Sequence, residues 1–124
     1  MPDDNAPLES GLLTVKQLDE GLQLRLSLKG ELDLSNAKIV ETALTEAFAS
    51  DKRILVDLGR LEFLDSTGIA LLVSALGRPD AERLSFLPSE SSGVRRLLSL
   101  TGLDKRMPIS TTTSAGSTPV LPAV

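Results

Sequence analysis

The stretch FLDSTGIALLVSAL, residues 63–76, decides the fold because it joins a predicted strand to a predicted helix. Before it, RILVDL at residues 53–58 is a short apolar run, typical of a strand that is covered on both faces or central in a sheet. After the acid, two hydroxyls and glycine of DSTG, the residues are apolar on nearly every side of a helix. We expect this helix over residues 68–77, because Pro79 prevents its continuation.

A β-hairpin is predicted on the N-terminal side. Leucines alternate strictly with polar residues over residues 22–29, which is the period of a strand with one buried face, and Gly30 is expected to end this strand. Residues 12–18 resemble an edge strand, and Asp-Glu-Gly at 19–21 supplies the turn between the two.

Two further helices and two further strands complete the predicted order. After the loop GELDLSNA, in which Ser35 can cap a helix, apolar residues recur every three or four positions at Ala37, Val40, Leu44, Ala47 and Phe48. Residues 84–88 predict a strand, and Ser91 caps a third helix whose buried face is Val94, Leu97 and Leu98. Gly102 occupies the left-handed C-terminal position, and residues 107–109 form one last short strand. Alternation of this kind predicts a small α/β structure with parallel crossovers.

The composition excludes most enzyme mechanisms. The 124 residues fit one domain and contain neither Cys nor His, so Ser-His and Cys-His pairs and the commonest zinc ligand are missing. We therefore expect no enzyme, no cofactor and no metal site. A net charge of -4 without Trp or Tyr argues against direct nucleic-acid binding.

The chain is expected to be a cytoplasmic protein that does not enter the membrane. Its first residues have neither a basic nor an apolar signal region, and no uncharged apolar run approaches the roughly 18 residues of a membrane span. Residues 1–11 are predicted to be a flexible segment, residues 12–109 the domain, and residues 110–124 a flexible Ser/Thr/Pro-rich tail.

The Asp-Ser-Thr-Gly turn allows two interpretations. Ser66 is a natural N-cap for the helix, and Asp65 lies beside the positive end of the helix dipole. Alternatively, Thr67 and Gly68 leave the first-turn amides free, so that they could receive a phosphate attached to Ser66.

The surface of the same helix also allows two interpretations. At about 100° per residue, Ile69, Leu72, Val73 and Leu76 share the core face. The residues that point away are then mostly apolar or small: Ala70, Leu71, Ser74, Ala75 and Arg78. This face is either a docking surface for another protein or is covered by a second layer of the same fold.

Three motifs together resemble those of the bacterial anti-sigma factor antagonists, the stand-alone STAS domains. They are GELD at residues 30–33, LVDLGRLEFLDSTG at residues 55–68 and SSGVRRLLSLTGLD at residues 91–104, and the resemblance extends over residues 12–109. It implies a mixed sheet of four to five strands with helices packed on it. The link GRPDAERL is shorter than is usual in the family, which leaves the identity of the partner open.

The resemblance also implies a function. Such proteins bind an anti-sigma factor that is a serine kinase with a histidine-kinase-like ATPase fold, and so release a sigma factor. The implied phosphoacceptor is Ser66, which a serine phosphatase would reset. The resemblance implies that Asp33 of the GELD motif helps to form the partner surface. Together with the outer face of the helix, which contributes Leu71, this predicts a partner surface of Asp33, Asp65, Ser66, Thr67, Gly68 and Leu71, on a chain expected to be a monomer when free.

Other functions are weighed against this one. A serine hydrolase lacks both a histidine base and the Gly-x-Ser-x-Gly pattern. A small-ligand or nucleotide-binding sensory module, or a scaffold that is never phosphorylated, stays open, although no Gly-rich phosphate loop is present. Asp57 and Glu62 could suggest an acid/base pair, but Asp57 is expected to accept backbone hydrogen bonds in the turn instead.

Overall fold

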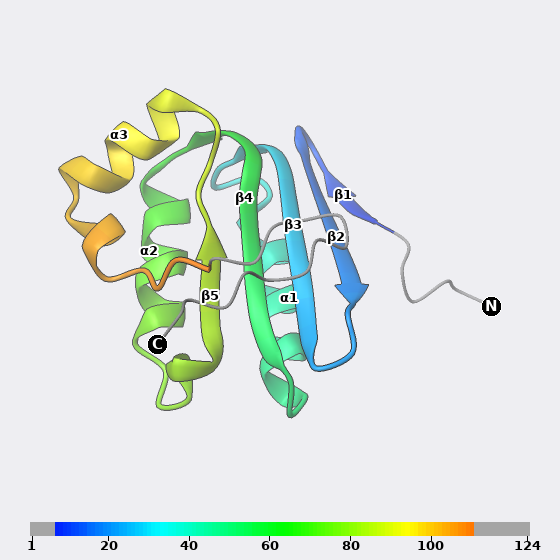
Figure 1. Cartoon of the computed structure of the whole chain (residues 1–124). Helices are drawn as coiled ribbons and strands as arrows, with labels where there is room; N and C mark the ends of the chain where they lie inside the picture. The colour runs from blue at the N-terminus through cyan, green and yellow to red at the C-terminus, as the bar shows by residue number, and fades with distance from the viewer. Residues whose placement is uncertain (1–6, 111–124) are drawn as a thin grey trace.

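A five-stranded mixed sheet organises the chain, and its spatial order follows the sequence, β1-β2-β3-β4-β5 (Figure 1). The computed structural model describes residues 7–110. The strands are β1 (Leu8–Ser10), β2 (Leu13–Asp19), β3 (Gln23–Leu32), β4 (Arg53–Leu64) and β5 (Leu84–Leu87). The first three pair antiparallel, whereas β3 with β4 and β4 with β5 are parallel, as the connecting helices require.

Three helices in residues 7–110 accompany this sheet. They are α1 (Ala37–Ala49), α2 (Ser66–Leu76) and α3 (Ser92–Leu100), with short 3₁₀ turns η1 (Ala81–Arg83) and η2 (Leu103–Lys105). Helices α1 and α2 pass behind the strands and α3 lies beyond β5 (Figure 1). The predicted α/β fold with a mixed sheet is therefore confirmed. None of the helices in residues 7–110 is long and apolar enough to cross a membrane.

The core lies between the sheet and the helices and follows the predicted periodicities. All five predicted apolar positions of α1 are buried. The strand residues that face the helices are buried as well: Leu24, Leu26, Leu28, Ile54, Val56 and Leu58. In α3, Val94 and Leu98 are buried, Leu97 is half-buried, the Ser91 hydroxyl accepts from the Val94 N–H, and Gly102 has φ 74°.

Two strands are longer than predicted because the sheet contains irregularities that a period of two does not reveal. Gly30 does not end β3, which runs to Leu32, and β4 continues beyond Leu58 to Leu64. The β3–β4 register shifts between Ser27 and Lys29 and again between Gly30 and Glu31. The two strands stay paired beyond these bulges, as far as Leu32 and Leu64.

At the end of the sheet where β3 and β4 begin, polar side chains fasten the β2–β3 turn and the loop after α1. The Lys52 ammonium binds Asp19 and, followed by the N–H of Gly21, holds the pKa of that carboxyl below its ordinary value. Arg83 donates to the backbone carbonyls of Phe48, Ser50 and Lys52. These contacts close the loop that leads from α1 into β4.

The structure revises the predicted ends and caps. Residues 8–10, within the segment expected to be flexible, pair with β2, while residues 1–6 lie outside the described part of the chain. The tail prediction also falls outside it except for Ser110, whose N–H donates to the Phe86 carbonyl. The strand expected at residues 107–109 is reduced to one parallel bridge, Phe86 with Ile109. Ser35 does not cap α1, because Asn36 is the N-cap and the Ser35 hydroxyl donates to Asp33 instead.

We predict that Gly30→Ala destabilises the domain much more than Gly21→Ala. Both glycines have positive φ, but a Cβ at position 30 would lie 2.0 Å from the Leu12 carbonyl oxygen, whereas one at position 21 meets nothing within 4 Å. Left-handed strain and overpacking together should lower the free energy of unfolding of Gly30→Ala by about 3 kcal/mol, against about 1 kcal/mol for Gly21→Ala. Urea denaturation measures both; equal losses would contradict the close approach of β2 and β3.

Candidate functional site

Asp65 connects two segments that are 32 residues apart in the sequence, the loop after Asp33 and the start of α2. It follows β4, at the same end of the sheet as the loop between β3 and α1 (Figure 1). Its Oδ1 accepts from the Gly68 N–H at 3.1 Å, and its Oδ2 accepts from the Leu34 N–H at 3.2 Å. The Asp65 N–H in turn donates to the Leu32 carbonyl at 3.2 Å. One residue therefore fixes the start of α2 against the β3–α1 loop.

Ser66 is the first residue of α2 rather than its N-cap. The prediction that Ser66 caps the helix is wrong, because Asp65 precedes it with extended backbone and supplies the capping oxygen. Ser66 is exposed, and within residues 7–110 its hydroxyl has no hydrogen-bond partner. The hydroxyl is therefore accessible and plays no part in holding the helix.

The first turn of α2 is only partly free to bind an anion. The Gly68 N–H is taken by Asp65, whereas no hydrogen bond of the N–H groups of Ser66 and Thr67 is found in the described part of the chain. Gly68 is itself buried, since a Cβ there would lie 2.2 Å from Leu64 Cδ1 and 3.1 Å from Leu32. The glycine thus lets α2 approach the sheet and offers a partner no side chain.

The loop that carries Asp33 is held by several hydrogen bonds of its own. Asp33 Oδ1 accepts from the N–H and the hydroxyl of Ser35 at 2.9 and 2.6 Å, and its backbone N–H donates to Asn36 Oδ1. Asn36 is buried and also donates to the Glu31 carbonyl at 2.8 Å. Asp33 is half-exposed, next to Leu34, which Asp65 holds. The structure therefore brings the two motifs together through backbone and carboxylate groups.

The predicted core face of α2 needs correction. Val73 is 40% exposed and Ala75 only 5% exposed, the reverse of the expectation. The cause is α1, which packs beside α2, so that the buried side of α2 faces both the sheet and α1 and is centred on Gly68, Leu72 and Ala75. Ile69 and Leu76 are half-buried and pack against the core.

Leu71 lies at the edge of a groove between α1 and α2. It is half-buried and packs against the core, so it is neither fully exposed nor sealed. The groove has a volume of about 460 Å³, and α2 contributes Thr67, Ala70, Leu71 and Ser74 to it. At its far end the Arg78 guanidinium lies 4.0 Å from the centroid of the Phe48 ring. The second interpretation thus holds in part, because α1 covers one side of this face, while docking of another protein on the open side stays a prediction.

Two exposed apolar residues flank the site and were not singled out from the sequence. Leu34 is 77% exposed in the β3–α1 loop, and Phe63 is 47% exposed two residues before Asp65. Phe63 stands inside the motif of residues 55–68 and Leu34 directly follows GELD, but periodicity assigns no direction to a loop residue or to the end of a bulged strand. Exposed apolar side chains beside an accessible hydroxyl suit a protein-binding surface.

Asp57 has the structural role expected of it. Its Oδ1 accepts from the Gly59 N–H at 2.8 Å and its Oδ2 lies 3.3 Å from Arg25, while Glu62 is exposed. Across residues 7–110 no cluster of three or more Asp or Glu side chains could hold a metal ion.

This combination of sheet, helices and loop–helix junction defines the STAS class of domains. Residues 16–111 match the family model described as Mlab, STAS domain. The chain therefore belongs to the STAS domain family.

Individual relatives agree with this assignment. The anti-sigma-F factor antagonist RsfB of Mycobacterium tuberculosis is 36% identical over 95 residues, covering 75% of this chain and 77% of the relative. The crystal structure of an anti-sigma factor antagonist from Mycobacterium paratuberculosis has a TM-score of 0.70 at 27% identity, over 81% of this chain and 86% of that one. The anti-sigma factor antagonist SpoIIAA in its unphosphorylated form has a TM-score of 0.63 at 23% identity, over 78% and 88%, which shows a shared fold.

We predict that Asp65→Ala destabilises the domain and that Ser66→Ala does not. Asp65→Ala removes the acceptor of two backbone N–H groups and should lower the free energy of unfolding by about 2 kcal/mol. Ser66→Ala removes an exposed hydroxyl and should change it by less than about 0.5 kcal/mol. Urea denaturation of both variants is the measurement, and a larger loss for Ser66→Ala would show that Ser66 caps the helix after all.

Proposed function

We propose that the chain is an anti-sigma factor antagonist whose unmodified form binds an anti-sigma factor with serine kinase activity and is released when Ser66 is phosphorylated. The observation that carries the proposal is the Ser66 hydroxyl, exposed and unbonded within the described chain at the start of α2. The name of the 36% identical relative, an anti-sigma-F factor antagonist, supports the same role. The role is one of binding, performed in the cytoplasm, and a serine phosphatase restores the binding form.

A phosphate on Ser66 should leave the fold intact. The hydroxyl makes no hydrogen bond in the described chain, and an anion at a helix N-terminus is favourable. The Ser66 and Thr67 amides are available to it, while both oxygens of Asp65 keep their backbone partners. The modification therefore changes the surface rather than the structure beneath it.

The same phosphate should oppose binding by charge and bulk. It adds about 1.5 to 2 negative charges next to Asp65. An acidic group of the partner about 5 Å from this phosphate would be repelled by roughly 3 kcal/mol at an effective dielectric of 20, and each 1.4 kcal/mol is about tenfold in affinity. An interface built on Leu34, Phe63 and the edge of the α1–α2 groove would also have to bury a hydrated group at its centre.

We predict that Ser66→Ala binds the anti-sigma factor with or without ATP, whereas Ser66→Asp binds at least about tenfold more weakly. Titration calorimetry with the purified anti-sigma factor measures both, and intact mass shows whether incubation with ATP adds one phosphate to the wild type and none to Ser66→Ala.

The matched control is Ser92→Asp, because Ser92 is likewise the exposed first residue of a helix. It should bind like the wild type. Equal affinities of Ser66→Ala and Ser66→Asp would defeat the proposed switch, and phosphorylation elsewhere would remove Ser66 as the acceptor.

We also predict that Leu34→Ser weakens binding by at least about tenfold without lowering the melting temperature, because this side chain is exposed in the free protein and its burial would be lost only in the complex. Leu22→Ser is the control, since Leu22 is 88% exposed at the β2–β3 turn, remote from α2. Leu71 is less suited to this test, because it also packs against the core. Unchanged affinity of Leu34→Ser would exclude the β3–α1 loop from the interface.

A further inference from the structure

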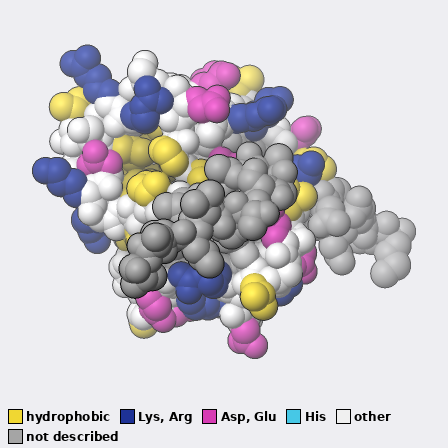
Figure 2. All heavy atoms as spheres, viewed as in Figure 1, with side chains coloured by type: hydrophobic (Ala, Val, Ile, Leu, Met, Phe, Trp, Pro, Cys, Tyr) yellow, Lys and Arg dark blue, Asp and Glu magenta, His cyan; other side chains and the backbone are white. Residues whose placement is uncertain are grey.

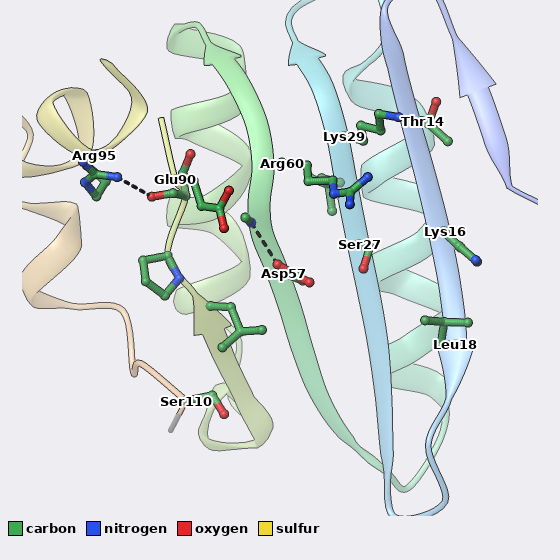
Figure 3. Close-up of a pocket in the computed structure, with 15 residues that line it drawn as sticks. Thr14, Lys16, Leu18, Ser27, Lys29, Asp57, Arg60, Glu90, Arg95 and Ser110 are labelled. Carbon is green, nitrogen blue, oxygen red and sulfur yellow. Dashed lines mark hydrogen bonds between the residues drawn. The ribbon is translucent and has the colours of Figure 1, made fainter. Parts of the chain in front are cut away.

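The sheet has a second face, opposite α1 and α2, with a broad polar groove. Its volume is about 940 Å³ and strands β2, β3, β4 and β5 all contribute to it (Figure 3). The lining side chains point away from the helix side, where the alternate residues of each strand are buried. Lys and Arg side chains stand out from several places on this face, among Asp and Glu side chains (Figure 2).

Three cations of the groove lie on adjacent strands without a compensating acid. Lys29 of β3 and Arg60 of β4 are direct partners in the sheet register, and Lys16 of β2 is diagonal to Lys29, which lies opposite Thr14. All three are exposed, and none of their side chains forms an ion pair or a hydrogen bond within the described chain. Like charges placed directly opposite each other weaken a sheet, so this arrangement carries a cost to stability.

Arg25, on the same face of the sheet, is a cation with a structural role. It is buried, and two carboxylates neutralise it, Glu20 at 3.1 Å and Asp57 at 3.3 Å. The groove also contains Arg95, which donates to the Ser89 carbonyl, and Glu90. Its lining thus has four cations, Lys16, Lys29, Arg60 and Arg95, against two acids, Asp57 and Glu90, in a chain of net charge -4. Asp57 is already engaged with Arg25 and with the Gly59 N–H.

We infer that this face binds an extended acidic segment of a partner protein. The cations span three strands, about 10 Å, which suits a chain with several carboxylates better than one compact ion. Nucleic acid is disfavoured because the acidic chain as a whole would repel it. The site goes beyond the proposed function: it lies on the face opposite α1 and α2, so it can be occupied whatever the state of Ser66.

The test is fluorescence anisotropy with the full-length protein and a labelled peptide of alternating Glu and Ser, compared with the same peptide carrying Gln for Glu. We expect binding of the Glu peptide alone, weakening as salt is raised. Lys29→Glu with Arg60→Glu should weaken it at least about tenfold, and the exposed control Lys38→Glu on α1 less than about twofold. Lys29→Glu alone should raise the melting temperature, because it converts a repulsive cross-strand pair into an attractive one.

Several outcomes would overturn the inference. These are equal binding of the Glu and Gln peptides, equal effects of the groove and control variants, or a lower melting temperature for Lys29→Glu. Tighter binding of duplex DNA or of anionic lipid vesicles than of the acidic peptide would do the same, by assigning the face to another partner. Peptide binding unchanged in Ser66→Asp would separate this site from the proposed switch, and loss of binding in that variant would refute their independence.

Discussion

The carboxylate shared by the backbone N–H groups of Leu34 and Gly68 is the contact on which the site depends. Asp65 stands where β4 ends and α2 begins, and its two oxygens tie the helix to a loop from elsewhere in the chain. Its own N–H is bound by the Leu32 carbonyl, so Asp65 is held in three directions. Gly68 completes the arrangement by letting the helix rest against Leu64 and Leu32. A flexible turn at this position could not present the same surface each time.

Because Asp65 caps α2, the Ser66 hydroxyl is not needed to hold the helix. The contrast with α3 is instructive: there Ser91 is the cap itself, and modification of its hydroxyl would remove the acceptor for Val94. At α2 the capping group and the hydroxyl belong to different residues. The cap of the helix therefore does not depend on the Ser66 hydroxyl, so the proposed phosphate would leave that cap in place.

Local pattern accounts for much of the fold. Alternating leucines, the apolar face of α1 and the Ser91 cap all depend on neighbours along the chain, and the structure contains each of them. The continuation of β3 through Gly30 depends instead on the Leu12 carbonyl, which sequence spacing does not place. The exchange of Val73 and Ala75 has the same origin, because it follows from α1 packing beside α2.

The candidate site shows the same division. The resemblance led to Asp33, Asp65 and Ser66, and the structure brings their two segments together through Leu34. It also assigns Ser35 and Ser66 different roles from those expected, since both serines stand one residue from the true boundary. Asn36 occupies the N-cap position of α1 without a side-chain cap hydrogen bond, and Asp65 caps α2. Leu34 and Phe63 could not have been found from periodicity, because their exposure depends on whether another part of the fold packs over them.

The sheet order β1-β2-β3-β4-β5 has a consequence for how the chain can form. Every strand after β1 pairs with the strand just before it in the sequence. Each pairing therefore closes a loop between consecutive strands and needs no strand from farther along the chain. A chain emerging from the ribosome can extend its growing edge one strand at a time, with α1 and α2 covering each addition as it is made.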